Sequence, residues 1–333
     1  MPDRERWLAP ELRATEYSFP ALLTSGAATA YAGIWFKDQG LSGSEIGLIG
    51  SVPVFIMLVL NLVVGRIADK ARDWRQVIVI GALLGGVIPI GLFFVHGFVG
   101  ILLVWTLASI PMAAIGPVSD AAALRLTKRR GTDFGFIRAW GTVGYMVAIV
   151  ITGQIVTVLG GGIFLPFFVG LALLRGLVSL PLPNFRAPKE ERTLAATGAS
   201  RLRAVMRPWF LLPLIGWSMV FATHLVLNSF QALLWKQQGI SDLTIAILIA
   251  LGAASEATMM FVFKRFAGRL PARPLILLSA VVAALRWVAM GFAPDVAILV
   301  PLQLLHSVTF ALGFMGCVHF IANWTSEDIA AEA

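Results

Sequence analysis

Apolar runs of about 20 residues recur along the chain from Phe19 to Asn323, and short polar or glycine-containing segments separate them. A helical run of this length crosses a hydrocarbon core of ~30 Å, because an α-helix rises ~1.5 Å per residue. Inside a membrane, the backbone groups of a single segment find hydrogen-bond partners only when the segment is helical. The pattern therefore predicts an all-α, polytopic membrane protein.

Loop signals between the runs, such as Asp38-Gln39-Gly40 and Pro183-Asn184, predict ten membrane-spanning helices. The predicted helices cover residues 17–36, 45–65, 74–94, 98–126, 134–159, 161–181, 209–235, 241–263, 274–291 and 297–322. The first 16 residues are polar and lack the apolar region of a cleavable signal, so the first helix is expected to remain as an anchor.

Composition agrees with a membrane protein, since 58% of the residues are hydrophobic and 13% are charged, against ~25% charged in soluble domains. Of the 26 Lys and Arg residues, 21 lie in the N-terminal segment and in alternate loops, whereas the intervening loops contain Lys37 and Lys236 alone. By the positive-inside rule, the N-terminus and the basic loops are cytoplasmic, and the protein is expected in the inner membrane of the cell. The net charge of +8 then serves topology and lipid headgroups, which excludes a nucleic-acid partner.

The residues of metal and catalytic sites are scarce. The single cysteine, Cys317, excludes an internal disulfide framework. The sequence has no cluster of cysteine, histidine and acidic residues with metal-ligand spacing, and it has no glycine-rich phosphate motif. We therefore expect no metal, no cofactor and no enzymatic activity.

Two opposite charges lie inside neighbouring predicted helices at equal depth. Asp120 precedes the basic turn after the fourth helix, and Arg138 follows the start of the fifth. Each is roughly 8 to 9 Å from the same surface at ~1.5 Å per residue, so the two can face each other. Embedded charges are costly and usually line a pathway, although a structural ion pair that fixes helix packing is the alternative.

Further polar residues lie inside the predicted helices. Arg175 lies near the cytoplasmic end of the sixth helix, where it can extend to the surface, so a structural role is expected. His224, Asn228 and Gln231 follow i, i+4, i+7 spacing and share one face of the seventh helix. That face is expected either to line a cavity and bind substrate or to pack against another helix.

The longest polar segment divides the chain into halves. We expect residues 1–183 to form an N-terminal six-helix half, 184–207 a cytoplasmic linker, and 208–333 a C-terminal half. The basic turn GRIADKARDWRQ from Gly65 has a weaker counterpart, AGRLPARP from Ala267, at the same place in the second half. Such repetition is expected for parallel repeats.

The turn that begins at Gly65 resembles the signature between the second and third helices of the major facilitator superfamily. The resemblance implies that Gly65 allows close helix approach, and that Asp69 and Arg72 belong to a cytoplasmic charge network that gates one conformation. Five further segments, in chain order, look like the phenylpropionate permease branch of that superfamily over nearly all of the chain. They are VSDAAAL from Val118, FIRAWGTVGY from Phe136, LGAASEATMMF from Leu251, LSAVVAALRWVAMG from Leu278 and LQLLHSVTF from Leu302.

The same positions are also similar to lactose permeases. That resemblance implies that Asp120 and Arg138 hold substrate, and that Arg286 and His306 take part in proton coupling. Lactose permeases carry a carboxylate three residues after the histidine, whereas this chain has Thr309 there.

If Thr309 replaces the usual proton site, another buried acid must carry the proton, and Glu256 is the clear candidate besides Asp120. Movement of Arg286 toward or away from Glu256 would then change the proton affinity of Glu256 when the conformation changes. The alternative is that these two residues merely neutralise each other. His306 suits a proton relay because imidazole titrates close to physiological pH, although it could equally join helices by a hydrogen bond.

The resemblance implies a secondary active transporter that takes up a small organic solute together with protons by alternating access. An aromatic carboxylate such as phenylpropionate is the expected substrate, with Arg138 as its anchor, because a guanidinium binds a carboxylate through two hydrogen bonds. Since Arg138 is also expected to pair with Asp120, a neutral sugar or nucleoside symported with protons is the alternative. The expected partners are substrate, protons and the lipid bilayer, and the protein is expected to be a monomer.

The superfamily has twelve helices, and ten are predicted here. The last two helices are therefore expected to be missing, which leaves four in the C-terminal half. A non-transporting, truncated remnant is accordingly a further alternative.

Overall fold

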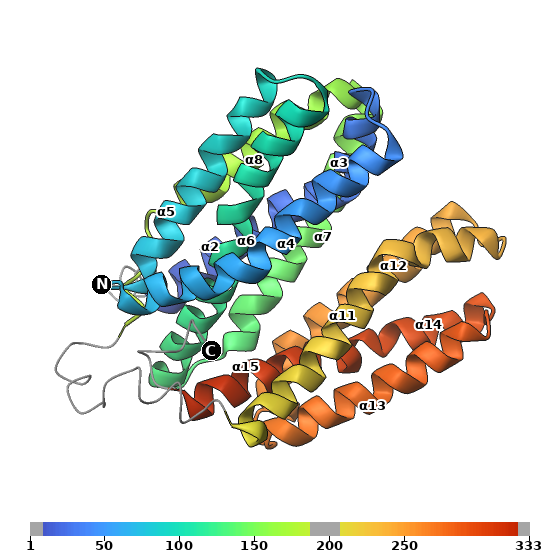
Figure 1. Cartoon of the computed structure of the whole chain (residues 1–333). Coiled ribbons are helices and arrows are strands. Elements are labelled where there is room, and N and C mark those ends of the chain that lie inside the picture. The colour runs from blue at the N-terminus through green and yellow to red at the C-terminus, as the bar shows by residue number, and fades with distance from the viewer. Residues whose placement is uncertain (1–8, 187–206, 326–333) are drawn as a thin grey trace, which may run out of the picture. The chain divides into compact units, whose positions relative to one another are not determined.

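The computed structural model describes residues 9–186 and 207–325. The chain forms two compact units, and residues 9–186 belong to the first and 207–325 to the second (Figure 1). The predicted linker at 184–207 lies almost wholly outside the described residues.

The first unit consists of seven α-helices and two short 3-10 segments within its described range. In chain order these are α2 (Pro10–Ala21), α3 (Leu23–Asp38), α4 (Gly43–Lys70), α5 (Trp74–Val87), η1 (Ile88–Phe93), α6 (Gly97–Arg130), α7 (Phe134–Leu159), η2 (Gly161–Ile163) and α8 (Phe164–Val178). In the second unit they are α11 (Pro208–Gln237), α12 (Asp242–Phe266), α13 (Ala272–Gly291), α14 (Val296–Leu304), the π-helical η3 (Ser307–Leu312) and α15 (Gly313–Trp324).

The predicted all-α fold class is confirmed, and the described ranges contain no strand. Nine helical segments in these ranges are long and apolar enough to cross a membrane. The predicted span 17–36 falls on two helices that join at Leu22, α2 of 12 residues and α3 of 16. The predicted span 297–322 is formed by α14, η3 and α15 in succession.

Local sequence signals fix the turn between α6 and α7. After Arg130 ends α6, Gly131 adopts a left-handed conformation with φ of 68°, which glycine tolerates because it has no Cβ atom. Asp133 then caps α7, since its carboxylate accepts a hydrogen bond from the backbone N–H of Gly135 at 2.9 Å. The turn therefore returns the chain along α6, with Arg138 in the second turn of α7.

Glycine brings α7 into close contact with α2 and α3. A Cβ atom at Gly144 in α7 would overlap the backbone carbonyl of Phe19 in α2, and one at Gly26 in α3 would overlap the carbonyl of Tyr145. Small residues allow this approach in membranes, where van der Waals packing holds helices together. The packing holds α2 and α3 against the helix that carries Arg138.

An aromatic cluster fills the space between the end of α3 and the starts of α6 and α8. Trp105 stacks on Phe168 with ring centroids 5.3 Å apart, and Phe36 meets Trp105 edge-on at 4.9 Å. Trp35 and Phe164 complete the cluster. Aromatic side chains bury large apolar areas, so the contacts among these rings stabilise the packing of α3 against α6 and α8.

In the second unit, the π-helical segment η3 lies at the centre of the packing. It contacts α12, α13 and α15, while α14 packs against α12. π-helical segments are rare in proteins, and those that do occur are often found at functional sites. The segment follows His306 directly and contains Thr309.

We expect Gly144→Ala to destabilise the first unit, because the added methyl group overlaps the carbonyl oxygen of Phe19 and forces α2 away from α7. Overpacking of this kind costs on the order of 1–3 kcal/mol. The matched control is Gly153→Ala in the same helix, where a Cβ atom meets nothing within 4 Å. Thermal unfolding of the purified chain in lipid nanodiscs measures both variants, and equal melting temperatures would contradict the close contact.

Candidate functional site

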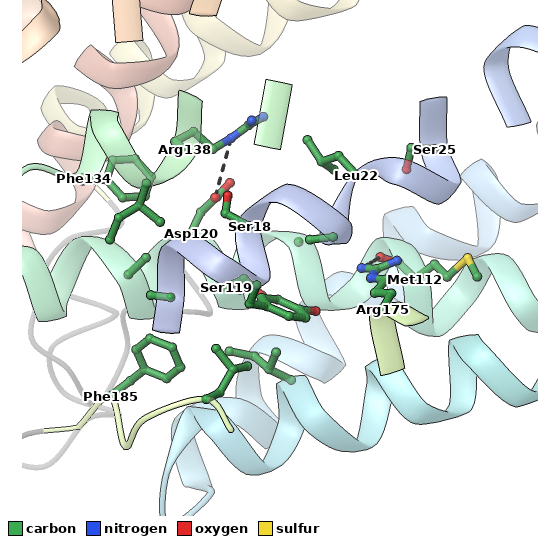
Figure 2. A pocket seen from close by; sticks show the side chains of 18 residues that line it. Ser18, Leu22, Ser25, Met112, Ser119, Asp120, Phe134, Arg138, Arg175 and Phe185 are labelled. Carbon is green, nitrogen blue, oxygen red and sulfur yellow. Dashed lines mark hydrogen bonds and ion pairs between the residues drawn. The ribbon is translucent and has the colours of Figure 1, made fainter. Parts of the chain in front are cut away.

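Asp120 of α6 and Arg138 of α7 form an ion pair in the first unit, as Figure 2 shows. The Nε atom of Arg138 lies 3.7 Å from Oδ1 of Asp120, which is an ion-pair contact rather than a hydrogen bond. A guanidinium N–H of Arg138 also points to the hydroxyl of Thr142 at 3.4 Å. The side chains of Arg138 and Asp120 are 18% and 30% exposed, so the pair faces open space within the unit.

That space is a cavity lined by residues of α2, α3, α5, α6, α7 and α8 and of the segment after α8. Its volume is about 160 Å³. Its apolar wall includes Ile78, Met112, Phe134, Ile137, Leu182 and Phe185. Its polar side chains include Tyr17, Ser18, Ser25, Ser119 and Arg175 besides the ion pair. An apolar cavity with a few converging polar groups is typical of a small-molecule site.

Arg175 of α8 differs from the sequence-based expectation. The side chain does not extend to the surface, because Arg175 is 5% exposed and lines the cavity. One of its N–H groups donates to the backbone carbonyl of Met112 at 3.1 Å. The reason is packing, since glycine residues of α5 and α8 bring these helices together at Gly86 and Gly176.

A second polar cluster lies in the second unit around Arg286 of α13, which is 1% exposed. Its Nη1 atom donates to the hydroxyl of Thr309 at 3.1 Å and lies 3.3 Å from Nδ1 of His306. Its Nη2 atom donates to the side-chain oxygen of Gln303. His306 in turn contacts Glu256 of α12, with 3.2 Å between Nε2 and Oε2.

The partners of His306 determine where its proton lies. Arginine only donates hydrogen bonds, so Nδ1 of His306 accepts from Arg286. The Nε2 atom then donates to the carboxylate of Glu256 at 3.2 Å.

The same reasoning orients His224 of α11, which is 1% exposed. Its Nδ1 atom lies 2.8 Å from the carbonyl of Val220, which only accepts, so Nδ1 carries the proton. Nε2 then accepts from the hydroxyl of Thr309 at 3.0 Å. Thr309 therefore accepts from Arg286 and donates to His224, and it links α11, α13 and η3 through one oxygen atom.

The structure thus gathers part of the predicted polar stripe of α11 into this cluster. His224 belongs to it through Thr309 and packs on Trp287 with ring centroids 5.0 Å apart. Gln231 is buried in the same helix. The side chain of Asn228 lies outside the part of the chain that the structure describes.

Gln303 was not singled out from the sequence, although it is part of the cluster. Its side-chain N–H group donates to the backbone carbonyl of Leu248 at 3.0 Å, and its oxygen accepts from Arg286. An amide inside the apolar run of α14, three residues before His306, was the available signal. The contact with α12 could not be inferred from spacing alone.

The predicted gate residues lie at the α4–α5 turn. Gly65 is buried in α4, and the carboxylate of Asp69 accepts from the indole N–H of Trp74 at 3.4 Å and pairs with Arg186 at 4.0 Å. Arg72 is exposed and lies outside this group.

Arg186 and Asp73 complete the group at this turn, and neither was singled out from the sequence. The guanidinium of Arg186 lies over the ring of Trp74 at 4.9 Å and donates to the carbonyls of Ala68 and Asp69. The carboxylate of Asp73 accepts from two backbone N–H groups at 185–186 and thereby ties the segment after α8 to the turn. The buried tryptophan beside two acidic residues was a signal for such a cluster.

Residues 21–333 match the model of the MFS_1 like family. The chain belongs to this family. It is a multi-pass membrane transporter of the major facilitator superfamily that moves a small-molecule substrate, and it is not an enzyme. The resemblance inferred from the sequence is confirmed.

Relatives of this chain transport different solutes. The chain is 26% identical over 337 residues to the probable 3-phenylpropionic acid transporter of Escherichia coli (strain K12), covering 97% of this chain and 84% of that protein. It is 28% identical over 289 residues to the maltose permease of Geobacillus stearothermophilus, covering 84% and 70%. The human organic anion transporter MFSD10 (TETRAN) shares the fold, with a TM-score of 0.70 at 17% identity, covering 97% and 88%.

We expect Thr309→Val to destabilise the second unit without changing side-chain volume, because Arg286 and His224 would lose their shared hydroxyl partner. The change would leave a buried donor on Arg286 and a buried acceptor on His224 unsatisfied, and each such group costs about 1–3 kcal/mol. Thr309→Ser should restore most of the loss. The control is Thr258→Val, whose exposed hydroxyl bonds only to the carbonyl of Ala254 in its own helix. Thermal unfolding compares the three variants, and an unchanged melting temperature for Thr309→Val would contradict the bridging role.

Proposed function

We propose that the protein takes up a small aromatic carboxylate, such as 3-phenylpropionate, together with protons. The observation that carries this proposal is the cavity of the first unit, which combines cationic groups with an apolar, aromatic wall. The similarity to a probable 3-phenylpropionic acid transporter supports the same substrate class. Uptake proceeds by alternating access, in the inner membrane, with the N-terminus in the cytoplasm and the protein acting as a monomer.

The charge balance of the cavity favours an anion. Its lining contains two guanidinium groups, Arg138 and Arg175, and one carboxylate, Asp120. A bound monoanion brings the net charge of the lining and the substrate together to zero. A site of low dielectric constant favours this, because an uncompensated buried charge is costly. The rings of Phe134 and Phe185 supply apolar surface for the aromatic part.

The cluster of the second unit suits proton coupling. Glu256 is the proton acceptor, His306 is the relay, and Arg286 responds to the charge on both. When Glu256 takes up a proton, its oxygen no longer attracts the N–H of His306 as strongly, and the imidazole is released from Arg286. The proton thereby changes the contacts of α12, α13 and α14.

The group around Asp69 acts as the conformational gate of the first unit. Its links among Trp74, Asp73 and Arg186 join the α4–α5 turn to the segment that follows α8. Release of these contacts frees both segments in a single step.

A neutral sugar or nucleoside symported with protons is the second candidate. It is favoured by the Asp120–Arg138 pair, which offers both an acceptor and donors to hydroxyl groups. The similarity to a maltose permease points the same way. Uptake assays with phenylpropionate, maltose and a nucleoside in parallel separate the two candidates.

We expect Arg138→Ala to abolish uptake of radiolabelled 3-phenylpropionate into proteoliposomes. The change leaves Asp120 without the guanidinium beside it and removes the positive excess that favours an anion. Arg265→Ala, an exposed position at the end of α12, is the control and should transport normally. Intact uptake by Arg138→Ala would contradict the role of the pair in substrate binding.

We expect Glu256→Gln to retain exchange of labelled for unlabelled substrate but to lose accumulation driven by a proton gradient. The amide keeps the size of the side chain and cannot bind or release the proton. Counterflow and gradient-driven uptake in the same proteoliposomes measure the two activities. Wild-type protein treated with a protonophore gives the reference for uncoupled transport, and gradient-driven accumulation by the variant would exclude Glu256 as the proton site.

A further inference from the structure

Three residues that line the cavity of the first unit each have a buried polar atom without a hydrogen-bond partner among the described residues. These atoms are the Nε atom of Arg175, the hydroxyl of Tyr17 and the hydroxyl of Ser119. Both Arg175 and Tyr17 are at least nine-tenths buried as residues. The three residues belong to α8, α2 and α6, and Ser119 lies beside Asp120 on α6.

Arg175 lacks a carboxylate partner within the described ranges. Its one side-chain hydrogen bond goes to the neutral carbonyl of Met112, and the ion pair of the unit's cavity joins Arg138 to Asp120 instead. A position in the last turn of α8 offsets part of the positive charge through the helix dipole. A guanidinium buried in a membrane-spanning segment normally has a counter-charge, and this one still lacks it.

We propose that Arg175, together with Tyr17, binds the carboxylate of the transported monoanion, while Arg138 stays paired with Asp120. This inference rests on the proposed function and assigns the anchor of its substrate. The guanidinium supplies the charge and a planar donor, and the hydroxyl of Tyr17 donates to a carboxylate oxygen. One bound anion would then be a partner for both groups.

The cavity separates the two polar ends along α6. Met112, which holds Arg175, and Asp120 are eight residues apart on this helix, or ~12 Å at the helical rise. Figure 2 shows Arg175 beside Met112 at one side of the view and Arg138 with Asp120 at the other. A substrate anchored at Arg175 therefore extends its apolar part along α6, between the two polar ends.

The proposal accounts for an arrangement that a neutral ligand does not explain. A sugar can satisfy the hydroxyl groups of Tyr17 and Ser119, but it leaves the charge of Arg175 without compensation. Two cations and one carboxylate line the cavity, so a single negative charge on the ligand completes the balance. The ligand class is consequently a monocarboxylate with an apolar body.

The test compares a charged ligand with its neutral counterpart. Calorimetric titration of the full chain in lipid nanodiscs measures the affinity for 3-phenylpropionate and for 3-phenylpropionamide, which have the same shape. The variants are Arg175→Gln, Arg175→Lys and Tyr17→Phe, and the control is Arg265→Gln, an exposed residue of the second unit that does not line the cavity. Thermal unfolding and retained affinity for the amide show that each variant is folded.

We expect Arg175→Gln to weaken carboxylate binding roughly tenfold to a hundredfold, the range for a hydrogen bond to a charged group, and to leave amide binding within about threefold. Arg175→Lys should fall in between, since lysine keeps the charge and loses the planar fork. Tyr17→Phe should weaken carboxylate binding about threefold to tenfold, as for one neutral donor. The control should match the wild type.

The outcomes separate this inference from the proposed function. Carboxylate binding that Arg175→Gln leaves unchanged would overturn the anchor alone. Carboxylate binding that depends on Arg175, in a protein that takes up no carboxylate into proteoliposomes, would support the anchor and overturn the transport proposal. A wild-type protein that binds no carboxylate, or that chloride saturates equally well at the same concentration, would overturn both.

Discussion

A charge inside a hydrocarbon layer must be neutralised by groups of the protein or by a bound ligand, and this constraint organises both units. In the first, Asp120 and Arg138 meet because the α6–α7 turn returns the chain at matching depth. In the second, Arg286 is surrounded by acceptors from other helices. Each cluster thus depends on helix packing, which in the first unit relies on glycine at the contact between α2 and α7.

The two clusters satisfy the constraint in different ways, and the difference suggests different tasks. The network around Arg286 is closed by side chains of its own unit, and its guanidinium is nearly inaccessible. The groups around Arg175 are instead arranged about an open cavity with donors that lack partners among the described residues. A closed network can hold or pass a proton, whereas an open one with unsatisfied donors needs a ligand. The proposed division of labour between the units follows from this contrast.

Much of this arrangement could be predicted from the sequence, because the rise of a helix and the length of an apolar run are fixed quantities. Nine of the ten predicted spans, the fold class and the meeting of Asp120 with Arg138 follow from those quantities, whereas the predicted span 17–36 is formed by two shorter helices. The position of Arg175 could not be predicted in this way. It depends on which helices are neighbours, and the glycine contacts between α5 and α8 determine that. Gln303 and Arg186 were missed for the same reason, since their partners lie on segments remote in sequence.

Thr309 explains how the second cluster can work with a single carboxylate. A threonine hydroxyl both accepts and donates, so it passes the influence of Arg286 on to His224 without adding a charge. Glu256 then remains the one acidic group in the network, and Arg286 divides its donors between the Thr309 side and the His306 side. In the proposed coupling, a proton on Glu256 would weaken only the His306 side and leave the guanidinium held mainly by Thr309 and Gln303. The network would then have a second arrangement of similar composition, which is what a proton-driven conformational switch requires.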